Sequence, residues 1–152
     1  MAEVTIRDVE ERVARVSELA VVSSLAVVGA PGEWRDRHTR YPAVVEDDCI
    51  VREFARVHGG CERETRIGRG TLLMAGSYVG HDVVMGESCE VAPNAVIGGC
   101  CTVGDRVKIG MGAMLRPHVV VGPGARIGAG AVVTKDVPAG ETWVGNPARR
   151  IR

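Results

Sequence analysis

The chain has few aromatic residues, no net charge and no long apolar run. Only 3% of its 152 residues are Phe, Trp or Tyr, which suits a thin interior with no room for rings. The formal net charge of zero argues against a nucleic-acid or anionic-membrane partner. No segment is apolar enough to span a bilayer or to serve as a signal peptide. From these absences we expect one cytoplasmic domain spanning residues 1–152.

The chain does carry an aliphatic residue or Met at every sixth position between residues 67 and 133. A period of six fits neither a lone helix nor an alternating strand, and is typical of a hexapeptide-repeat β-helix. The position two residues earlier is mostly small, and the position one residue later is often Gly, which we expect to supply left-handed backbone geometry at the corners. The series reads Ile67, Leu73, Val79, Met85, Val91, Ile97, Val103, Ile109, Leu115, Val121, Ile127 and Val133.

Three hexads make one turn of a triangular prism, so the pattern predicts an all-β parallel β-helix. Its regular coils run from about residue 44 to residue 134, followed by a tail over 135–152. A conventional sandwich or barrel would not hold one register over so many hexads. A solenoid of this kind has open ends and exposed walls, which a cyclic homotrimer covers, and the grooves between neighbours would form equivalent sites.

Two insertions interrupt the period. Val57 and Ile67 are ten residues apart, so His58–Arg66 contains four extra residues and is predicted to be a loop at a corner, shaping an acceptor site. A second irregular stretch, Pro31–Pro42, is charged and contains Trp34. The first fifteen residues fit either a coil or a helix.

The cysteines do not form a recognisable metal or disulfide pattern. There is no Cys-x-x-Cys pair, and Cys49, Cys89 and Cys101 fall in the small inward column, where a thiol is an apolar filler. Cys100 is expected to face outward, and Cys61 to lie in the loop. We therefore favour structural cysteines and expect no bound metal.

Among the four histidines, His81 is in the position best suited to catalysis. It follows the inward Val79 by two residues, so its ring is predicted to point outward into a groove, and Asp82 follows it. A neutral imidazole that a carboxylate orients is a good general base near neutral pH. By position alone, an ordinary surface histidine is the alternative.

Several segments resemble the left-handed β-helix acyltransferases. The run LLMAGSYVGHD at Leu72–Asp82, with Val51–His58 before it, resembles the UDP-N-acetylglucosamine acyltransferases of lipid A synthesis. VGHDVVMG at Val79–Gly86 and the tail segments Ile127–Gly140 and Val144–Arg149 resemble sugar acetyltransferases, including the sialic acid and bacillosamine types. The resemblance implies a left-handed prism and transfer of an acyl group to an amine or hydroxyl of a sugar or nucleotide sugar.

The resemblance also implies roles for individual residues. His81 would be the general base, Asp82 would hold its orientation, and the backbone N–H of Gly99 would stabilise the tetrahedral intermediate. No covalent enzyme intermediate is implied. The acyl donor would be acetyl-CoA or another acyl-CoA, with an acyl carrier protein as the other possibility. Residues matched to donor binding are Gly112, Gly130, Lys135 and Arg149, and those expected to contact the acceptor are His58 and Tyr78.

The chain departs from both branches. Cys100 stands where the lipid A enzymes have a His, Tyr78 replaces another His of that branch, and Gly76 replaces an Asn of both. The acceptor pocket is therefore expected to differ, and we do not assign lipid A synthesis. The acceptor, the choice of O- or N-acylation, the acyl length and the donor carrier stay open.

Two other functions are compatible with the same fold. The γ-class carbonic anhydrases hold zinc with three His; His58 and His81 lie where two ligands could be, but position 86, where the third is expected, is Gly. A non-catalytic trimeric scaffold is the second alternative, and it predicts that His81 is dispensable.

Overall fold

The computed structural model describes residues 14–30 and 39–152. Within them every regular element is a short β-strand, and no helix could cross a membrane. Most of the segment whose conformation the sequence left open, residues 1–13, lies outside the described residues. So do residues 31–38 of the insertion Pro31–Pro42.

The strands form three parallel sheets that make the walls of a prism. The first wall contains β1 (Ala14–Val16), β4 (Ala43–Val45), β7 (Thr65–Ile67), β10 (Val84–Met85), β13 (Thr102–Val103) and β16 (Val120–Val121). The second contains β2 (Val21–Val22), β5 (Ile50–Val51), β8 (Leu72–Leu73), β11 (Glu90–Val91), β14 (Lys108–Ile109) and β17 (Arg126–Ile127), and ends with β19 (Thr142–Val144) and the antiparallel β20 (Arg149–Arg150). The third contains β3 (Val27–Ala30), β6 (Arg56–His58), β9 (Tyr78–Val79), β12 (Val96–Ile97), β15 (Met114–Leu115) and β18 (Val132–Val133).

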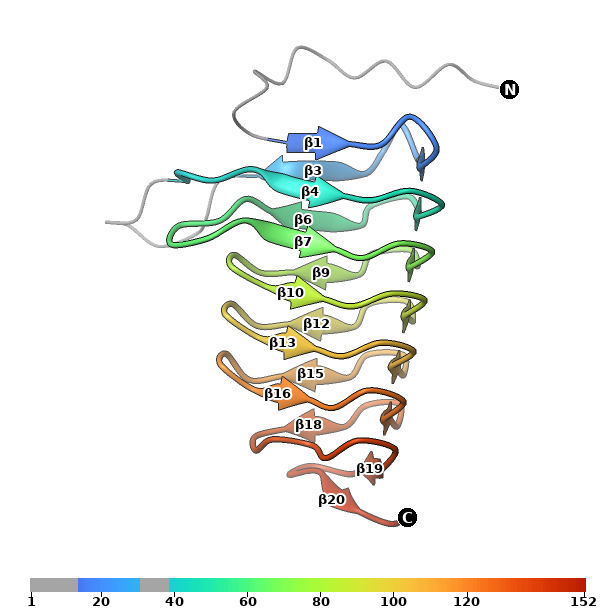
Figure 1. Cartoon of the computed structure of the whole chain (residues 1–152). Helices are drawn as coiled ribbons and strands as arrows, with labels where there is room; N and C mark the ends of the chain where they lie inside the picture. The colour runs from blue at the N-terminus through green and yellow to red at the C-terminus, as the bar shows by residue number, and fades with distance from the viewer. Residues whose placement is uncertain (1–13, 31–38) are drawn as a thin grey trace.

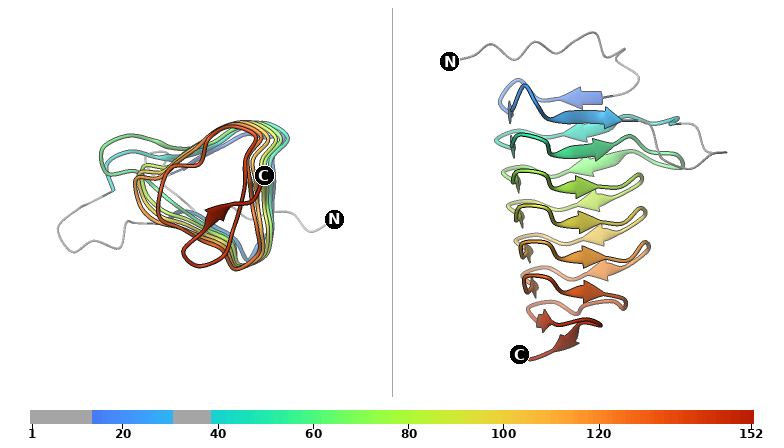
Figure 2. Two further views of the ribbon diagram at one scale, coloured as in Figure 1. Left: turned by 90° about the horizontal axis from the view of Figure 1, so that it is seen from below. Right: turned by 180° about the vertical axis from the view of Figure 1, so that it is seen from behind.

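The prism is left-handed. In Figure 1 the chain crosses the near wall from left to right, returns across the far wall from right to left, and descends as it does so. Seen along the axis, the coils superpose as a triangle, and the loop after β6 projects from one of its corners (Figure 2). The fold expected from the six-residue period is therefore confirmed.

The predicted inward residues form the core. Register pairs Ile67 with Met85 and Met85 with Val103, so each coil places an aliphatic side chain directly over that of the next coil. From Val45 to Val133 these side chains are at most 3% exposed. Burying each one contributes about 1.5–3 kcal/mol before the entropy of folding is subtracted, and the small residues two positions earlier fill the remaining space near the axis.

The corner glycines serve a different purpose from the one that the sequence suggested. From Gly68 to Gly128 the glycines that directly follow the inward residue do not have positive φ; that geometry falls two residues later, where Gly70 and Gly124 adopt it, as do non-glycine residues such as Asp48 and Ser88. The earlier column needs Gly because coils approach closely. A Cβ at Gly104, for instance, would lie 2.6 Å from the backbone N of Pro123 in the next coil.

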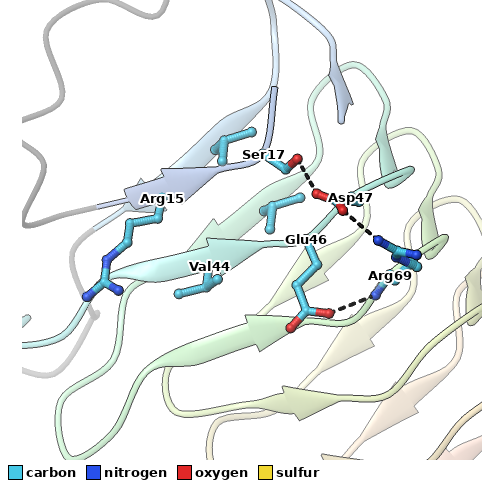
Figure 3. Close-up of a pocket in the computed structure, with 8 residues that line it drawn as sticks. Arg15, Ser17, Val44, Glu46, Asp47 and Arg69 are labelled. Carbon is cyan, nitrogen blue, oxygen red and sulfur yellow. Dashed lines mark hydrogen bonds and ion pairs between the residues drawn. The ribbon is translucent and has the colours of Figure 1, made fainter. Parts of the chain in front are cut away.

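A cluster of ion pairs joins the first coil to the two below it (Figure 3). Asp47 accepts hydrogen bonds from the Ser17 hydroxyl and the Arg69 guanidinium, and these two donors lower its pKa. Glu46 pairs with Arg66 at 2.6 Å and also accepts from the backbone N–H of Arg69. Glu46 and Asp47 line a shallow pocket beside these bonds, and both carboxylates already accept hydrogen bonds from the protein. We therefore interpret the cluster as one that holds the N-terminal coil on the rest of the prism.

The glycine finding predicts unequal effects of two substitutions to alanine. Gly104→Ala forces a Cβ against the backbone of the next coil and should lower the free energy of unfolding by about 2–3 kcal/mol. Gly124→Ala meets nothing within 4 Å and suffers only its φ of 70°, so about 1 kcal/mol is expected. Urea denaturation of both variants measures the difference, and equal losses would contradict the close-approach explanation.

Candidate active site

His81 and Asp82 lie at the corner between the third and first walls, between β9 and β10. The corner itself places Asp82 in left-handed backbone geometry, with φ of 60°. Because each coil repeats the last, Gly99, Pro117 and Lys135 occupy the position of His81 in the following three coils. This edge of the prism is therefore a continuous column of corner residues.

A hydrogen-bonded pair orients the imidazole. His81 Nδ1 and Asp82 Oδ2 are 2.6 Å apart, and the His81 side chain is 14% exposed. Since a carboxylate only accepts hydrogen bonds, Nδ1 carries the hydrogen, and Nε2 of the neutral ring then presents a lone pair. The arrangement is that of a neutral imidazole whose Nε2 is available to take a proton.

Asp82 in turn is held by the loop that follows β6. Asp82 Oδ1 accepts hydrogen bonds from the backbone N–H groups of Cys61 at 2.9 Å, Glu62 at 2.8 Å and Arg63 at 2.8 Å. Arg63 Nε also donates to the backbone carbonyl of Asp82 at 2.9 Å, and Asp82 N–H donates to Thr65 Oγ1 at 2.8 Å. The insertion is thus bonded directly to the His81–Asp82 pair.

These contacts decide the charge of Asp82. Burial alone would raise its pKa, but the backbone N–H of Arg63, the His81 ring and the N–H groups of Glu62 and Cys61 together lower it. The carboxylate therefore stays ionised at neutral pH and holds its hydrogen bond to the imidazole.

Gly99 lies against the ring of His81, one coil further along. A Cβ at Gly99 would lie only 2.6 Å from His81 Nε2, so the ring occupies the space that a side chain would take. Within the described part of the chain, the Gly99 N–H donates no hydrogen bond, and a Cβ at Gly80 would stand 2.7 Å from that nitrogen. Because neither Gly80 nor Gly99 has a side chain, nothing from these two residues covers the Gly99 nitrogen or displaces the His81 ring.

The residues expected to meet the acceptor lie on the third wall near this corner. His58, at the end of β6, is buried, and its ring is 4.9 Å from the ring of the half-buried Tyr78 on β9. Gly60 pairs with Tyr41 through backbone hydrogen bonds, so the described ends of both insertions meet here.

The residues matched to donor binding are divided between different parts of the prism. Lys135 lies in the His81 column, exposed, three coils on, about 14 Å away at the spacing of paired strands. Gly112 and Gly130 lie at another edge, between the second and third walls, with φ of 63° and 64° and open space beside them. Arg149 is on the terminal strand β20. Within one chain the structure brings only Lys135 to the same edge as His81.

Cys61 lies next to His81 and Asp82, although no pattern in the sequence assigns it to the site. It was expected to be one of the structural cysteines, in a loop, but it is buried beside the His81–Asp82 pair. Its position depends on how a loop of irregular sequence folds back over a corner. No periodic pattern indicates that, and only the insertion's length pointed to the region.

Comparison with known families agrees with this architecture. A family model described as bacterial transferase hexapeptide (six repeats) matches residues 64–99 and 100–135. These residues belong to the hexapeptide-repeat family. The chain is also 57% identical over 108 residues to an acyl-[acyl-carrier-protein]--UDP-N-acetylglucosamine O-acyltransferase of Saccharophagus degradans, covering 69% of this chain and 42% of the relative. The equivalent protein of Azotobacter vinelandii is 53% identical over 109 residues, again covering 42% of the relative.

The chain spans about two fifths of the length of the curated relatives it matches. Among solved structures, LpxA from Acinetobacter baumannii superposes with a TM-score of 0.88 at 24% identity, over 91% of this chain and 55% of that one, which supports the fold. WeeI from Acinetobacter baumannii AYE superposes with a TM-score of 0.70 at 31% identity, over 88% of this chain and 58% of that one.

Removing the Asp82 carboxylate should loosen the loop. Asp82→Ala leaves three backbone N–H donors without an acceptor and should lower the free energy of unfolding by about 3 kcal/mol. Asp136 is the matched control, because it occupies the same corner position three coils on, is exposed, and accepts from one N–H, that of Val120. Asp136→Ala should cost less than about 1 kcal/mol. Urea denaturation compares the two, and equal losses would refute the role of Asp82 in anchoring the loop.

The same contacts predict how the loop responds to acid. The pKa of Asp82 is lowered in the folded protein, so the stabilisation is fully present above its ordinary value of about 3.9 and is lost as the pH falls through the lowered value. Amide hydrogen exchange at Cys61, Glu62 and Arg63 should therefore accelerate only in strong acid. Asp82→Asn, which cannot ionise, should abolish this dependence; an unchanged pH profile in that variant would assign it to another group.

Proposed function

We propose that this protein transfers an acyl group from a thioester to a hydroxyl or amine of a sugar or nucleotide sugar, with His81 as general base. The observation that carries the proposal is the His81–Asp82 pair, in which the ionised carboxylate is bonded to Nδ1 and Gly99 of the next coil lies against Nε2. The names of the relatives, UDP-N-acetylglucosamine O-acyltransferases, support the same class of reaction.

In the proposed reaction, Nε2 of His81 takes the proton from the acceptor hydroxyl or amine as that atom attacks the thioester carbonyl. A new C–O or C–N bond forms, and the negative charge on the carbonyl oxygen is stabilised by the Gly99 N–H. The tetrahedral intermediate then collapses, the C–S bond breaks, and the proton on His81 passes to the departing thiolate. Asp82 stays ionised throughout and stabilises the imidazolium that forms between the two transfers.

The edge that carries His81 suits the binding of both substrates. The loop at residues 59–64, His58 and Tyr78 lie on the N-terminal side of His81, where we place the acceptor. Lys135 lies on the C-terminal side, where we place the phosphate-bearing donor, an acyl-CoA or an acyl carrier protein. Arg149, Gly112 and Gly130 reach the same donor only if another copy of the chain supplies them.

Because the donor site would need residues from a second copy of the chain, we propose that the protein is a homotrimer. Met111, Met114 and Val120 leave apolar side chains between 46% and 59% exposed on the coils beyond His81, a surface that packing against a neighbouring prism would bury. In a cyclic trimer each His81 edge would face an edge of the next copy. We place this assembly in the cytoplasm, where acyl thioesters are made.

His81→Ala tests the proposed base. It should reduce acyl transfer by about 10²–10⁴-fold, the usual contribution of a general base, while leaving the folded assembly intact because the ring is not in the core. The measurement is release of free thiol from acetyl-CoA and longer acyl-CoA or acyl carrier protein donors, against a panel of sugar and nucleotide-sugar acceptors.

His118→Ala is the matched control, since this histidine occupies the same edge two coils further on and is exposed. It should transfer at close to the wild-type rate. Full activity of His81→Ala would refute the mechanism. A wild-type protein without activity on any donor and acceptor would favour the scaffold.

A further inference from the structure

Cys61 completes a cluster of three metal-binding side chains at the candidate active site. Its Sγ, a ring nitrogen of His81 and a carboxylate oxygen of Asp82 all lie within 4.8 Å of one another. The residues come from two segments about twenty positions apart, which the loop at residues 59–64 folds together. Among the residues that the structure describes, no other group of three such side chains meets this condition.

The three side chains are held in place before any ion binds. Cys61 is 6% exposed, and its own N–H is bonded to Asp82 Oδ1. That oxygen is engaged by three backbone donors, while Oδ2 faces His81. A ligand set fixed by its own hydrogen bonds loses little conformational entropy on binding, as supported metal ligands require.

The donor atoms select the ion. One thiolate, one imidazole nitrogen and one carboxylate oxygen suit Zn²⁺ and similar transition-metal ions, whereas Mg²⁺ and Ca²⁺ take oxygen ligands. Ligands at about 2.0–2.3 Å from a tetrahedral ion stand roughly 3.3–3.7 Å apart, so His81 Nδ1 and Asp82 Oδ2, now 2.6 Å apart, must separate to admit the ion. Three protein ligands leave a fourth position open to water.

We infer that Cys61, His81 and Asp82 bind one Zn²⁺-like ion, which takes the place of the proton between the imidazole and the carboxylate. Binding releases the proton of the thiol, moves the ring hydrogen of His81 from Nδ1 to Nε2 and forms three metal–ligand bonds. With Nδ1 bound to the ion and Nε2 carrying the hydrogen, His81 has no lone pair with which to take a proton from the acceptor. The metal therefore switches off the acyl transfer. This inhibition rests on the proposed function; the metal binding itself does not.

Cys100 provides a matched control for Cys61. It lies at the same edge, in the coil after His81, and is partly exposed, but it is not a member of the cluster. The remaining cysteines are in the core, where burial raises the pKa of Cys49, Cys89 and Cys101, the last to about 11. Effects at Cys61 can thus be separated from general thiol chemistry.

The test uses the whole chain, freed of metal by a chelator and kept reduced by a phosphine. Equilibrium dialysis with Zn²⁺ should show one tight ion per chain, and Co²⁺ should give thiolate-to-metal charge-transfer bands. Both should persist in Cys100→Ser. In Cys61→Ser the bands should disappear, and Zn²⁺ affinity should fall by about 100-fold or more, since even supporting residues are worth 10–100-fold.

Absence of saturable Zn²⁺ binding, or unchanged affinity and bands in Cys61→Ser, would overturn the site. Because dialysis needs no substrate, a zinc-binding protein without acyl transfer would support the site while refuting the proposed function. Acyl transfer that persists with the site saturated by Zn²⁺ would refute the inhibition.

Discussion

The structure depends on the constant spacing of parallel strands from one coil to the next. Backbone hydrogen bonds set that distance, and the inward aliphatic residues fill the prism at the same interval. The spacing leaves no room for a Cβ where corners approach, which explains the glycines at 104 and 110. It also aligns the corners, so that residues eighteen positions apart become neighbours.

The candidate site depends on this stacking of corner residues from successive coils. Gly99 comes to lie on the ring of His81 only because it follows by one whole coil. The corner at Asp82, with its positive φ, directs the carboxylate back to the preceding coil. A single carboxylate there binds the imidazole with one oxygen and three loop amides with the other.

The insertion after β6 gives this edge properties that a regular coil would not have. It buries Cys61 beside His81 and meets the second insertion through Tyr41. Regular coils supply the base and the oxyanion donor in our proposal, whereas the irregular segments supply the environment. An edge assembled in this way can keep one chemistry while its acceptor changes.

The sequence by itself determined the prism, its inward residues and the location of the loop, because a six-residue period repeated over many coils has one physical solution. It also singled out His81, Asp82 and Gly99 through their resemblance to known acyltransferases. The reason for the corner glycines was wrong, since close approach between coils is not visible in a linear pattern. Only the tertiary structure decided which loop atoms reach Asp82 and that Cys61 joins the pair, because those contacts come from a segment without periodicity.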